Sequence, residues 1–171
     1  PGAAAAIVVG DQVAWSRGFG FANTQESLAA TADTPFALAS VSKTFIGVAV
    51  MQAVEDGLVA LDTPVDELGL PFAVDNPHYI GEELTLRELV THTSGIRDGD
   101  TYECNYYLEE TQTPLVNELV PGACPEPAIT DLGGFLEEYL TVGGVFYDDQ
   151  ANFQTADEGA IGELWAYSNV G

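Results

Sequence analysis

The start of the chain has the pattern of a β-hairpin. Two apolar, β-prone runs, residues 5–9 and 12–20, are joined at Gly10-Asp11. A glycine and an aspartate between two such runs favour a tight turn. Two strands alone are barely stable in water, and no later segment has a clearly better strand pattern. We therefore expect this hairpin to be part of a larger sheet.

A continuous apolar pattern from Val41 to about Val54 predicts a helix. Apolar residues occur on nearly every side of it, Ser40 stands at the cap position, and Gly57 follows its end. A helix that is apolar all round needs contacts on all sides. We expect a central, buried helix that begins at Ser40.

Two further segments have the spacing of short helices. In residues 84–95, LTLRELVTHTSG, Thr85 is the expected N-cap and Gly95 the stop. In residues 131–140, Asp131 is the expected cap, despite Gly133-Gly134. Residues 61–64 read as a turn and residues 97–130 as loops. The side chains expected to face inward are Leu86, Leu89 and Val90 in the first helix and Leu132, Phe135, Leu136 and Tyr139 in the second.

Composition and charge exclude several classes of protein. With 171 residues, 46% of them hydrophobic, the chain suits one globular domain with a real core. No apolar run reaches the roughly 18 residues needed to span a bilayer. The formal charge is −23, and the chain from Asp98 onward contains no lysine, arginine or histidine. Such a negative field repels phosphate backbones, which argues against nucleic acid as a partner.

The two cysteines, Cys104 and Cys124, lie outside any spacing typical of a zinc site. We expect a disulfide between them, and two reduced, buried thiols are the alternative. A disulfide implies an oxidising compartment, so the expected location is periplasmic or extracellular.

The candidate chemistry starts with Ser40 and Lys43, the only lysine of the chain. A serine hydroxyl is a weak nucleophile that needs an adjacent base. Residues three apart share a helix face, so the Lys43 amine can reach the Ser40 hydroxyl, and the helix N-terminus adds partial positive charge near the serine. The alternative is a capping serine followed by a surface lysine. S-x-x-K by itself is a weak pattern.

A second candidate pair lies near the C-terminus in WAYSNVG, where Tyr167 and Asn169 are two residues apart. In an extended loop these side chains point to the same side. A tyrosine oxygen beside a lysine can shuttle a proton, and an asparagine amide can hold a substrate carbonyl. Taken alone, the tripeptide favours a buried aromatic with a turn asparagine.

Four segments in this order resemble the serine β-lactamase-related family, which includes class C β-lactamases, penicillin-binding-protein-like D,D-peptidases and esterases. They are PGAAAAIVVGDQVAWSRGFGFAN, FALASVSKTFIGVAVMQAVEDGLVALDTPV, LTLRELVTHTSGI and YSNVG. The resemblance implies an α/β (α+β) fold, an antiparallel sheet with a helical domain. It also implies that Ser40 is the acylated nucleophile, Lys43 its base, Tyr167 the general acid or base, and Asn169 the substrate-positioning amide. It implies no metal or cofactor.

The match to the family is partial. The family's third motif, lysine or histidine before a small residue and glycine, stands on a closing strand that supplies one oxyanion donor, and this chain has none. Loss of one such donor costs about a hundredfold in rate. We expect residues 1–171 to be a single partial domain whose C-terminal strands are missing, which folds at best partly and shows no turnover. Because chain ends fray, we expect the geometry of Tyr167 and Asn169 relative to Ser40 to be loose. Within it, 1–96 is family-like, 97–164 is an atypical acidic insertion, and 165–171 carries the Y-x-N motif.

Other chemistry is less well supported by the sequence. A Ser-His-Asp hydrolase would need a histidine base, but no G-x-S-x-G elbow surrounds Ser40, and the resemblance makes His92 a packing residue. His78 is expected at the surface. The acidic pairs Asp98-Gly99-Asp100 and Asp148-Asp149 lack the twelve-residue spacing of an EF-hand and are expected to be surface loops.

Two classes of function follow from the sequence. The first is a serine hydrolase that acts through an acyl-enzyme on an amide, β-lactam or ester carbonyl. The second is a non-catalytic or incomplete module that binds penicillin or a peptide. Either would take a small-molecule or peptide-like acyl ligand. The sequence does not distinguish among the three substrate classes, and it does not define an oligomeric state.

Overall fold

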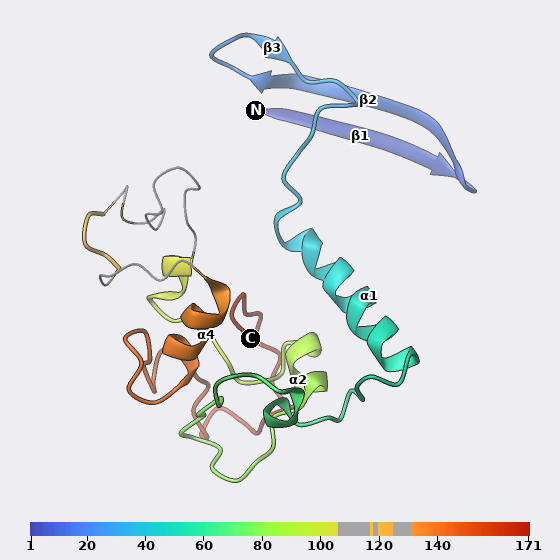
Figure 1. Ribbon diagram of the computed structural model, residues 1–171. Coiled ribbons are helices and arrows are strands. Elements are labelled where there is room, and N and C mark those ends of the chain that lie inside the picture. Colours follow the sequence, from blue (N-terminus) through green and yellow to red (C-terminus); the bar gives the residue numbers. More distant parts are fainter. Residues whose placement is uncertain (106–116, 118–119, 125–130) are drawn as a thin grey trace. The chain divides into compact units, whose positions relative to one another are not determined.

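A computed structural model describes residues 1–105, 117, 120–124 and 131–171 of the chain (Figure 1). The chain divides into two compact units, Pro1–Ile46 and Gly47–Gly171. The described elements are a three-stranded antiparallel sheet and helices, so the predicted mixed fold class is confirmed. None of the helices in the described residues is long and apolar enough to cross a membrane.

The sheet lies in the first unit and contains the predicted hairpin. Strand β1 (Gly2–Val9) pairs antiparallel with β2 (Gln12–Asn23), and Val9 faces Gln12 across the turn. Gly10 has φ of 62°, a left-handed conformation that glycine adopts without steric cost. The hairpin prediction is therefore confirmed. A short third strand, β3 (Leu28–Ala29), pairs with β2, and the sequence analysis did not predict it.

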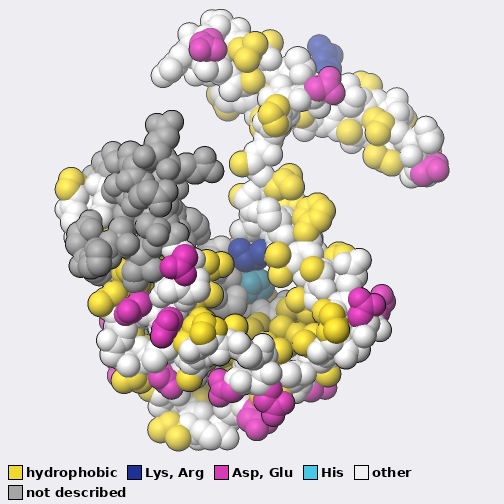
Figure 2. Space-filling model, in the orientation of Figure 1, with side chains coloured by type: hydrophobic (Ala, Val, Ile, Leu, Met, Phe, Trp, Pro, Cys, Tyr) yellow, Lys and Arg dark blue, Asp and Glu magenta, His cyan; other side chains and the backbone are white. Residues whose placement is uncertain are grey.

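Glycine allows a close backbone approach in this sheet. A Cβ atom at Gly18 would collide with the backbone of Ala30 and Thr31, so the segment after β3 can run against β2 only because residue 18 has no side chain. Most large apolar side chains of the strands stay at the surface, from Trp15 at 42% exposure to Val9 at 66%. Figure 2 shows these hydrophobic side chains along the hairpin.

Helix α1 (Ser42–Glu55) follows a 3-10 turn, η1 (Ala39–Val41). Ser40 lies inside η1 and the cap position belongs to Leu38, so the prediction that the helix begins with Ser40 as its cap is wrong. The helix ends as predicted, because Gly57 adopts φ of 70°. No residue of α1 is buried, which corrects the expectation of a buried helix. The physical reason lies in the core of the second unit, which is completed by side chains from later in the chain.

Helix α2 (Leu86–Thr91) begins with the predicted cap. Thr85 and Glu88 form a reciprocal capping box. The helix ends before the predicted stop at Gly95, because His92 already takes the left-handed conformation, with φ of 58°. Leu86 is half-buried and Leu89 packs against the core, whereas Val90 is 39% exposed, so its predicted inward position is wrong.

Helix α4 (Leu132–Leu140) carries the centre of the core in the second unit. The Asp131 side chain accepts a hydrogen bond from the Gly134 amide at 2.7 Å, which confirms the predicted cap. Phe135 and Tyr139 are fully buried, as predicted, but Leu132, at the first helical position, is 65% exposed, so its predicted inward position is wrong. The core residues are Ile96, Cys104, Cys124, Phe135, Tyr139, Leu140, Phe146 and Phe153.

The loops around this core include the predicted disulfide. Cys104 and Cys124 are bonded, with their Cα atoms 5.7 Å apart, so that prediction is confirmed. Cys104 lies in the 3-10 turn η3 (Tyr102–Asn105), and another such turn, η2 (Val65–Leu68), follows Pro64. Part of the segment expected to be loop, 106–116, 118–119 and 125–130, lies outside the described residues.

Candidate active site

The predicted nucleophile and its base lie at the junction of η1 and α1, in the first unit. Ser40 is exposed and is the middle residue of η1, while Lys43 is half-buried in the first turn of α1. The two residues thus follow one helical path, on which a spacing of three places them on the same face. Ala39, directly before Ser40, has φ of 46°. A left-handed alanine is strained by roughly 1–2 kcal/mol, and strain of this kind is concentrated at functional sites.

Tyr167 and Asn169 lie in the C-terminal loop of the second unit. The Tyr167 hydroxyl donates a hydrogen bond to Asn169 Oδ1 at 3.1 Å, so the two side chains point to the same side, as their spacing predicts. Tyr167 is 41% exposed. Its ring lies beside that of His92, with centroids 4.8 Å apart. Tyr167 is thus partly exposed to solvent, while its ring packs against His92.

Asp98 holds this loop, and the sequence analysis missed it. Its Oδ1 accepts hydrogen bonds from the Ser168 hydroxyl at 2.9 Å, the Asn169 amide at 2.7 Å and the Val170 amide at 3.2 Å. Its Oδ2 accepts one from Asn169 Nδ2 at 2.6 Å. Asp98 had been assigned to a surface loop. The sequence shows Asp98 only as a polar residue shortly after the expected end of a helix. This position does not indicate that Asp98 binds a loop about 70 residues later.

The C-terminal loop is anchored at further points. Ser168 is buried, and its hydroxyl oxygen accepts hydrogen bonds from the amides of Val170 at 3.1 Å and Gly171 at 2.9 Å. The Ala166 amide donates to the His92 carbonyl at 2.8 Å. Long-range hydrogen bonds therefore tie this end of the chain to the rest of the second unit.

His92 supports the loop by packing. Besides its contact with Tyr167, its ring stands edge-on to Trp165 with centroids 6.2 Å apart, and its Nδ1 accepts from the Ser168 amide at 3.4 Å. These contacts fit the packing role that the resemblance implies. His78 is half-buried, and its Nε2 lies 2.6 Å from the Asp149 carbonyl oxygen, which links two loops.

The residues on both sides of Asp98 are fixed as well. The buried Tyr139 hydroxyl donates to the Arg97 carbonyl at 2.8 Å and accepts from the Gly99 amide. Burial raises the pKa of Tyr139, and the nearby Asp98, Asp148 and Asp100 carboxylates add to the increase, so the phenol stays protonated. The Arg97 guanidinium donates to Glu158 at 2.6 Å and, with hydrogen bonds from Thr155, lowers the pKa of Glu158 to about 2.

The structure thus brings Tyr167 and Asn169 together and describes Ser40 and Lys43 in the other unit. No group of His, Cys, Asp or Glu in the described part of the chain is arranged to hold a metal ion.

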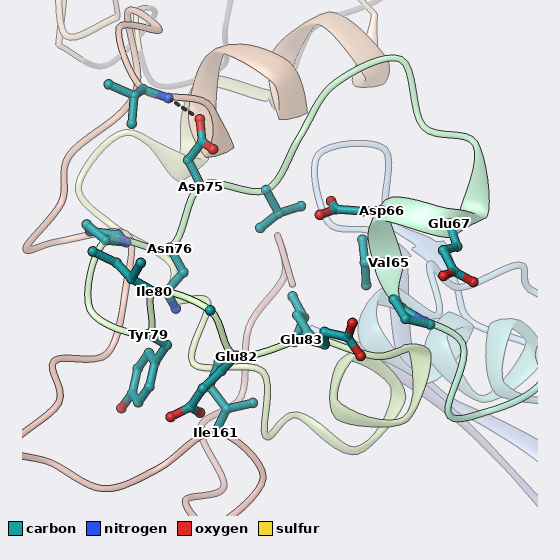
Figure 3. A pocket seen from close by; sticks show the side chains of 16 residues that line it. Val65, Asp66, Glu67, Asp75, Asn76, Tyr79, Ile80, Glu82, Glu83 and Ile161 are labelled. Atoms are coloured by element: carbon teal, nitrogen blue, oxygen red, sulfur yellow. Dashed lines mark hydrogen bonds between the residues drawn. The ribbon is translucent and has the colours of Figure 1, made fainter.

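The second unit has a pocket of about 680 Å³ (Figure 3). None of the four candidate catalytic residues lines it. Asp75 stands on its wall and accepts a hydrogen bond from the Val142 amide at 3.0 Å. Its other acidic lining residues are Asp66, Glu67, Glu82 and Glu83. The described lining contains no serine, cysteine, histidine or lysine, so this pocket offers no nucleophile with an adjacent base for acyl transfer.

Comparison with known proteins gives one family. The family model described as beta-lactamase matches residues 1–120. An uncharacterized protein of Alkalihalophilus pseudofirmus is 40% identical over 65 residues, which are 38% of this chain and 18% of that protein. The mitochondrial serine beta-lactamase-like protein LACTB of Bos taurus is 33% identical over 99 residues, 57% of this chain and 17% of that protein. The chain therefore spans less than a fifth of the length of these two relatives.

One solved structure shares the fold. The octameric penicillin-binding protein homologue from Pyrococcus abyssi matches with a TM-score of 0.62 and 24% identity, over 93% of this chain and 30% of that one. This likeness supports the fold, and the match of the family model over most of the chain identifies the family. The chain belongs to the β-lactamase family.

Proposed function

We propose that this chain carries the nucleophile, the base and the Y-x-N pair of a serine hydrolase that acts through an acyl-enzyme on an amide, β-lactam or ester carbonyl. The observation that carries the proposal is the placement of Ser40 and Lys43 on one helical path, in a chain whose residues 1–120 match the β-lactamase family. The family consists in general of serine hydrolases. The assignment of catalysis to this chain is ours.

The chemistry follows from the properties of the four side chains. Ser40 Oγ attacks the carbonyl carbon while its proton passes to Nζ of Lys43, and a tetrahedral intermediate forms. The bond to the leaving group then breaks, and Tyr167 gives that group a proton. Water attacks the resulting ester of Ser40 and gives a proton to the Tyr167 oxygen. The acid leaves as Ser40 Oγ takes its proton back from Lys43, which restores all three side chains. The side-chain amide of Asn169 binds and positions the substrate carbonyl group. The partial positive charge at the start of α1 stabilises the negative charge that develops on Ser40 Oγ.

The substrate class stays broad in this proposal. The names of the relatives and of the matching structure mention beta-lactamase and penicillin binding, which favours a β-lactam or a peptide-like acyl compound. The disulfide favours a periplasmic or extracellular location. We treat residues 1–171 as one partial domain of this fold, with 97–164 as an acidic insertion.

The test is covalent labelling with a fluorophosphonate probe and a fluorescent penicillin. We expect stoichiometric covalent labelling of the chain, because an activated serine hydroxyl attacks the electrophilic centre of either probe. Labelling should disappear in Ser40→Ala. Ser42→Ala is the matched control, since Ser42 is an exposed serine two residues away and should leave labelling unchanged.

Two outcomes would overturn the proposal. Labelling that persists in Ser40→Ala would place the nucleophile elsewhere. Reversible retention of the penicillin by a folded chain, with no covalent product from either probe, would favour a non-catalytic module that binds penicillin or peptides.

A further inference from the structure

The two carboxylate oxygens of Asp98 contact different parts of the C-terminal loop. Oδ1 accepts from the Ser168 hydroxyl and from the backbone amides of Asn169 and Val170. Oδ2 accepts from the side-chain amide of Asn169 at 2.6 Å. One oxygen therefore anchors the backbone of the loop, and the other contacts the side-chain amide.

The second contact determines which way the amide of Asn169 points. With Nδ2 donating to Asp98, Oδ1 is directed to the Tyr167 hydroxyl and accepts from it at 3.1 Å. If the amide were rotated by half a turn, its carbonyl oxygen would face the carboxylate oxygen. Two acceptors in contact repel each other, so the carboxylate selects one orientation.

We propose that Asp98 is the positioning residue of the Y-x-N motif: it fixes the orientation of the Asn169 amide and, through it, the hydrogen bond of the Tyr167 hydroxyl. Its importance for catalysis rests on the proposed function. With Asn169 Oδ1 as acceptor, the hydrogen bond from the Tyr167 hydroxyl holds the phenol oxygen in a fixed place beside the amide. A rotated amide would present an N–H group instead, and Tyr167 would have to accept that hydrogen bond and direct its proton elsewhere.

The side chain of Asp98 is held in place for this task. Its neighbours Arg97 and Gly99 are both bound to the buried hydroxyl of Tyr139, and the Arg97 amide donates to the Asn152 carbonyl at 2.8 Å. The chain beyond Asp98 has no basic residue, so no lysine or arginine from that part can compete for the carboxylate. The four donors described above are N–H and O–H groups of the C-terminal loop.

Two substitutions of Asp98 distinguish the roles of its two carboxylate oxygens. In Asp98→Asn, the amide oxygen can still accept from the loop backbone, but the new NH₂ group faces Asn169 Nδ2, so donor meets donor. In Asp98→Ala both sets of hydrogen bonds are lost. In the double variant Asp98→Asn/Asn169→Asp, the side-chain NH₂ group at position 98 can donate a hydrogen bond to the carboxylate at position 169. Asp100→Asn is the control, because it removes the same charge from an exposed residue of the same turn.

The first readout is nuclear magnetic resonance of the ¹⁵N-labelled chain, which requires no activity. We expect Asp98→Ala to speed hydrogen exchange at the Asn169 backbone amide by about 10- to 100-fold, the range for loss of a hydrogen bond to a charged group. Asp98→Asn should retain most of that protection but shift the side-chain NH₂ signals of Asn169. The double variant should recover the backbone protection. Unchanged Asn169 side-chain signals in Asp98→Asn, or unchanged exchange in Asp98→Ala, would overturn the proposal.

The second readout is the rate of Ser40 labelling as a function of probe concentration. We expect Asp98→Asn to lower the maximal rate by about 100-fold, the cost of a misplaced catalytic group, with little change in the half-saturating probe concentration. If Asp98 had a purely structural role, the Asp98→Asn variant would also fold poorly, and its magnetic resonance spectrum would show this. If the unaltered chain showed no Ser40 labelling, the proposed function would fail, while the exchange measurements would still decide the positioning role.

Discussion

The two pairs of candidate residues are held in different ways. Ser40 and Lys43 are placed by the path of η1 and α1, which is set by residues close to them in the sequence. Tyr167 and Asn169 are placed by Asp98 and His92, which lie about seventy positions earlier in the chain. The first pair needs only local structure, whereas the second needs the folded core of its unit. Changes to that core should therefore affect the Y-x-N pair and leave the Ser40 turn intact.

The largest effect is expected from a matched pair of phenylalanines. Phe135→Ala should lower the free energy of unfolding of the second unit by about 3–5 kcal/mol, because Phe135 is fully buried in α4 against Tyr139 and Phe146. Phe45→Ala in α1 should change it by less than about 0.5 kcal/mol, because Phe45 is 65% exposed.

Urea unfolding followed by the fluorescence of Trp165, in a Trp15→Phe background, reports on the second unit. Equal losses of stability in the two alanine variants would show that α1 is packed as firmly as α4, which would contradict the difference between the regions.

The disulfide is expected to have the next largest effect. Replacing both cysteines, Cys104→Ser with Cys124→Ser, should destabilise the second unit by about 3 kcal/mol, because the bond closes a loop with a sequence separation of 20. Protection of the Asn169 amide should fall in parallel, since Cys104 and Cys124 belong to the same core. Two alkylatable thiols in the unreduced, denatured chain would contradict the bond itself.

Lys43→Arg tests the local pair without disturbing the fold. A guanidinium stays protonated and cannot accept the proton of Ser40, so the labelling rate should fall by about a hundredfold or more with unchanged stability. Arg17→Lys is the control, because it also exchanges arginine and lysine in the first unit, but at a residue without a proposed catalytic role. Retention of more than about a tenth of the labelling rate in Lys43→Arg would remove the base assignment.

The smallest effect concerns pH. Glu158 has its pKa lowered to about 2, first by the hydrogen bond from Arg97 and then by those from Thr155. A carboxyl group whose folded pKa is lowered stabilises the fold above its unfolded pKa, and this stabilisation is lost as the pH falls from about 4.5 toward the folded value of about 2. Arg97→Met should make the loss of stability over this interval shallower.

Arg17→Met provides the control for net charge, because it removes one positive charge from the first unit. An identical acid dependence in Arg97→Met and in the unaltered chain would show that the Arg97–Glu158 pair does not contribute to stability.

The sequence predicted the locally determined features well. The hairpin around Gly10, the Thr85 cap and the Asp131 cap each depend on neighbouring residues, and all three are present. It failed where tertiary contacts decide. The apolar pattern of α1 was read as burial, although the core forms around Phe135 and Tyr139 instead. Asp98 could not be assigned, because a single aspartate in a turn does not identify donors at the far end of the chain.

The early end of α2 shows the same limit. Gly95 was the obvious stop, yet His92 adopts the left-handed conformation first, and its ring then packs on Tyr167. The tertiary contact compensates for a conformation that a histidine seldom adopts. Among the predicted site residues, the pairing of Tyr167 with Asn169 followed from their spacing, and its support by Asp98 did not.

The measurement that tests the central claim most directly is peptide mapping by mass spectrometry after the chain has reacted with the fluorophosphonate probe. We predict one adduct per chain, on the Ser40 hydroxyl, absent from Ser40→Ala and slowed in both Lys43→Arg and Asp98→Asn. An adduct on Ser42, Tyr167 or another residue, or no adduct on a chain in which Asn169 exchange shows the loop to be folded, would contradict the account.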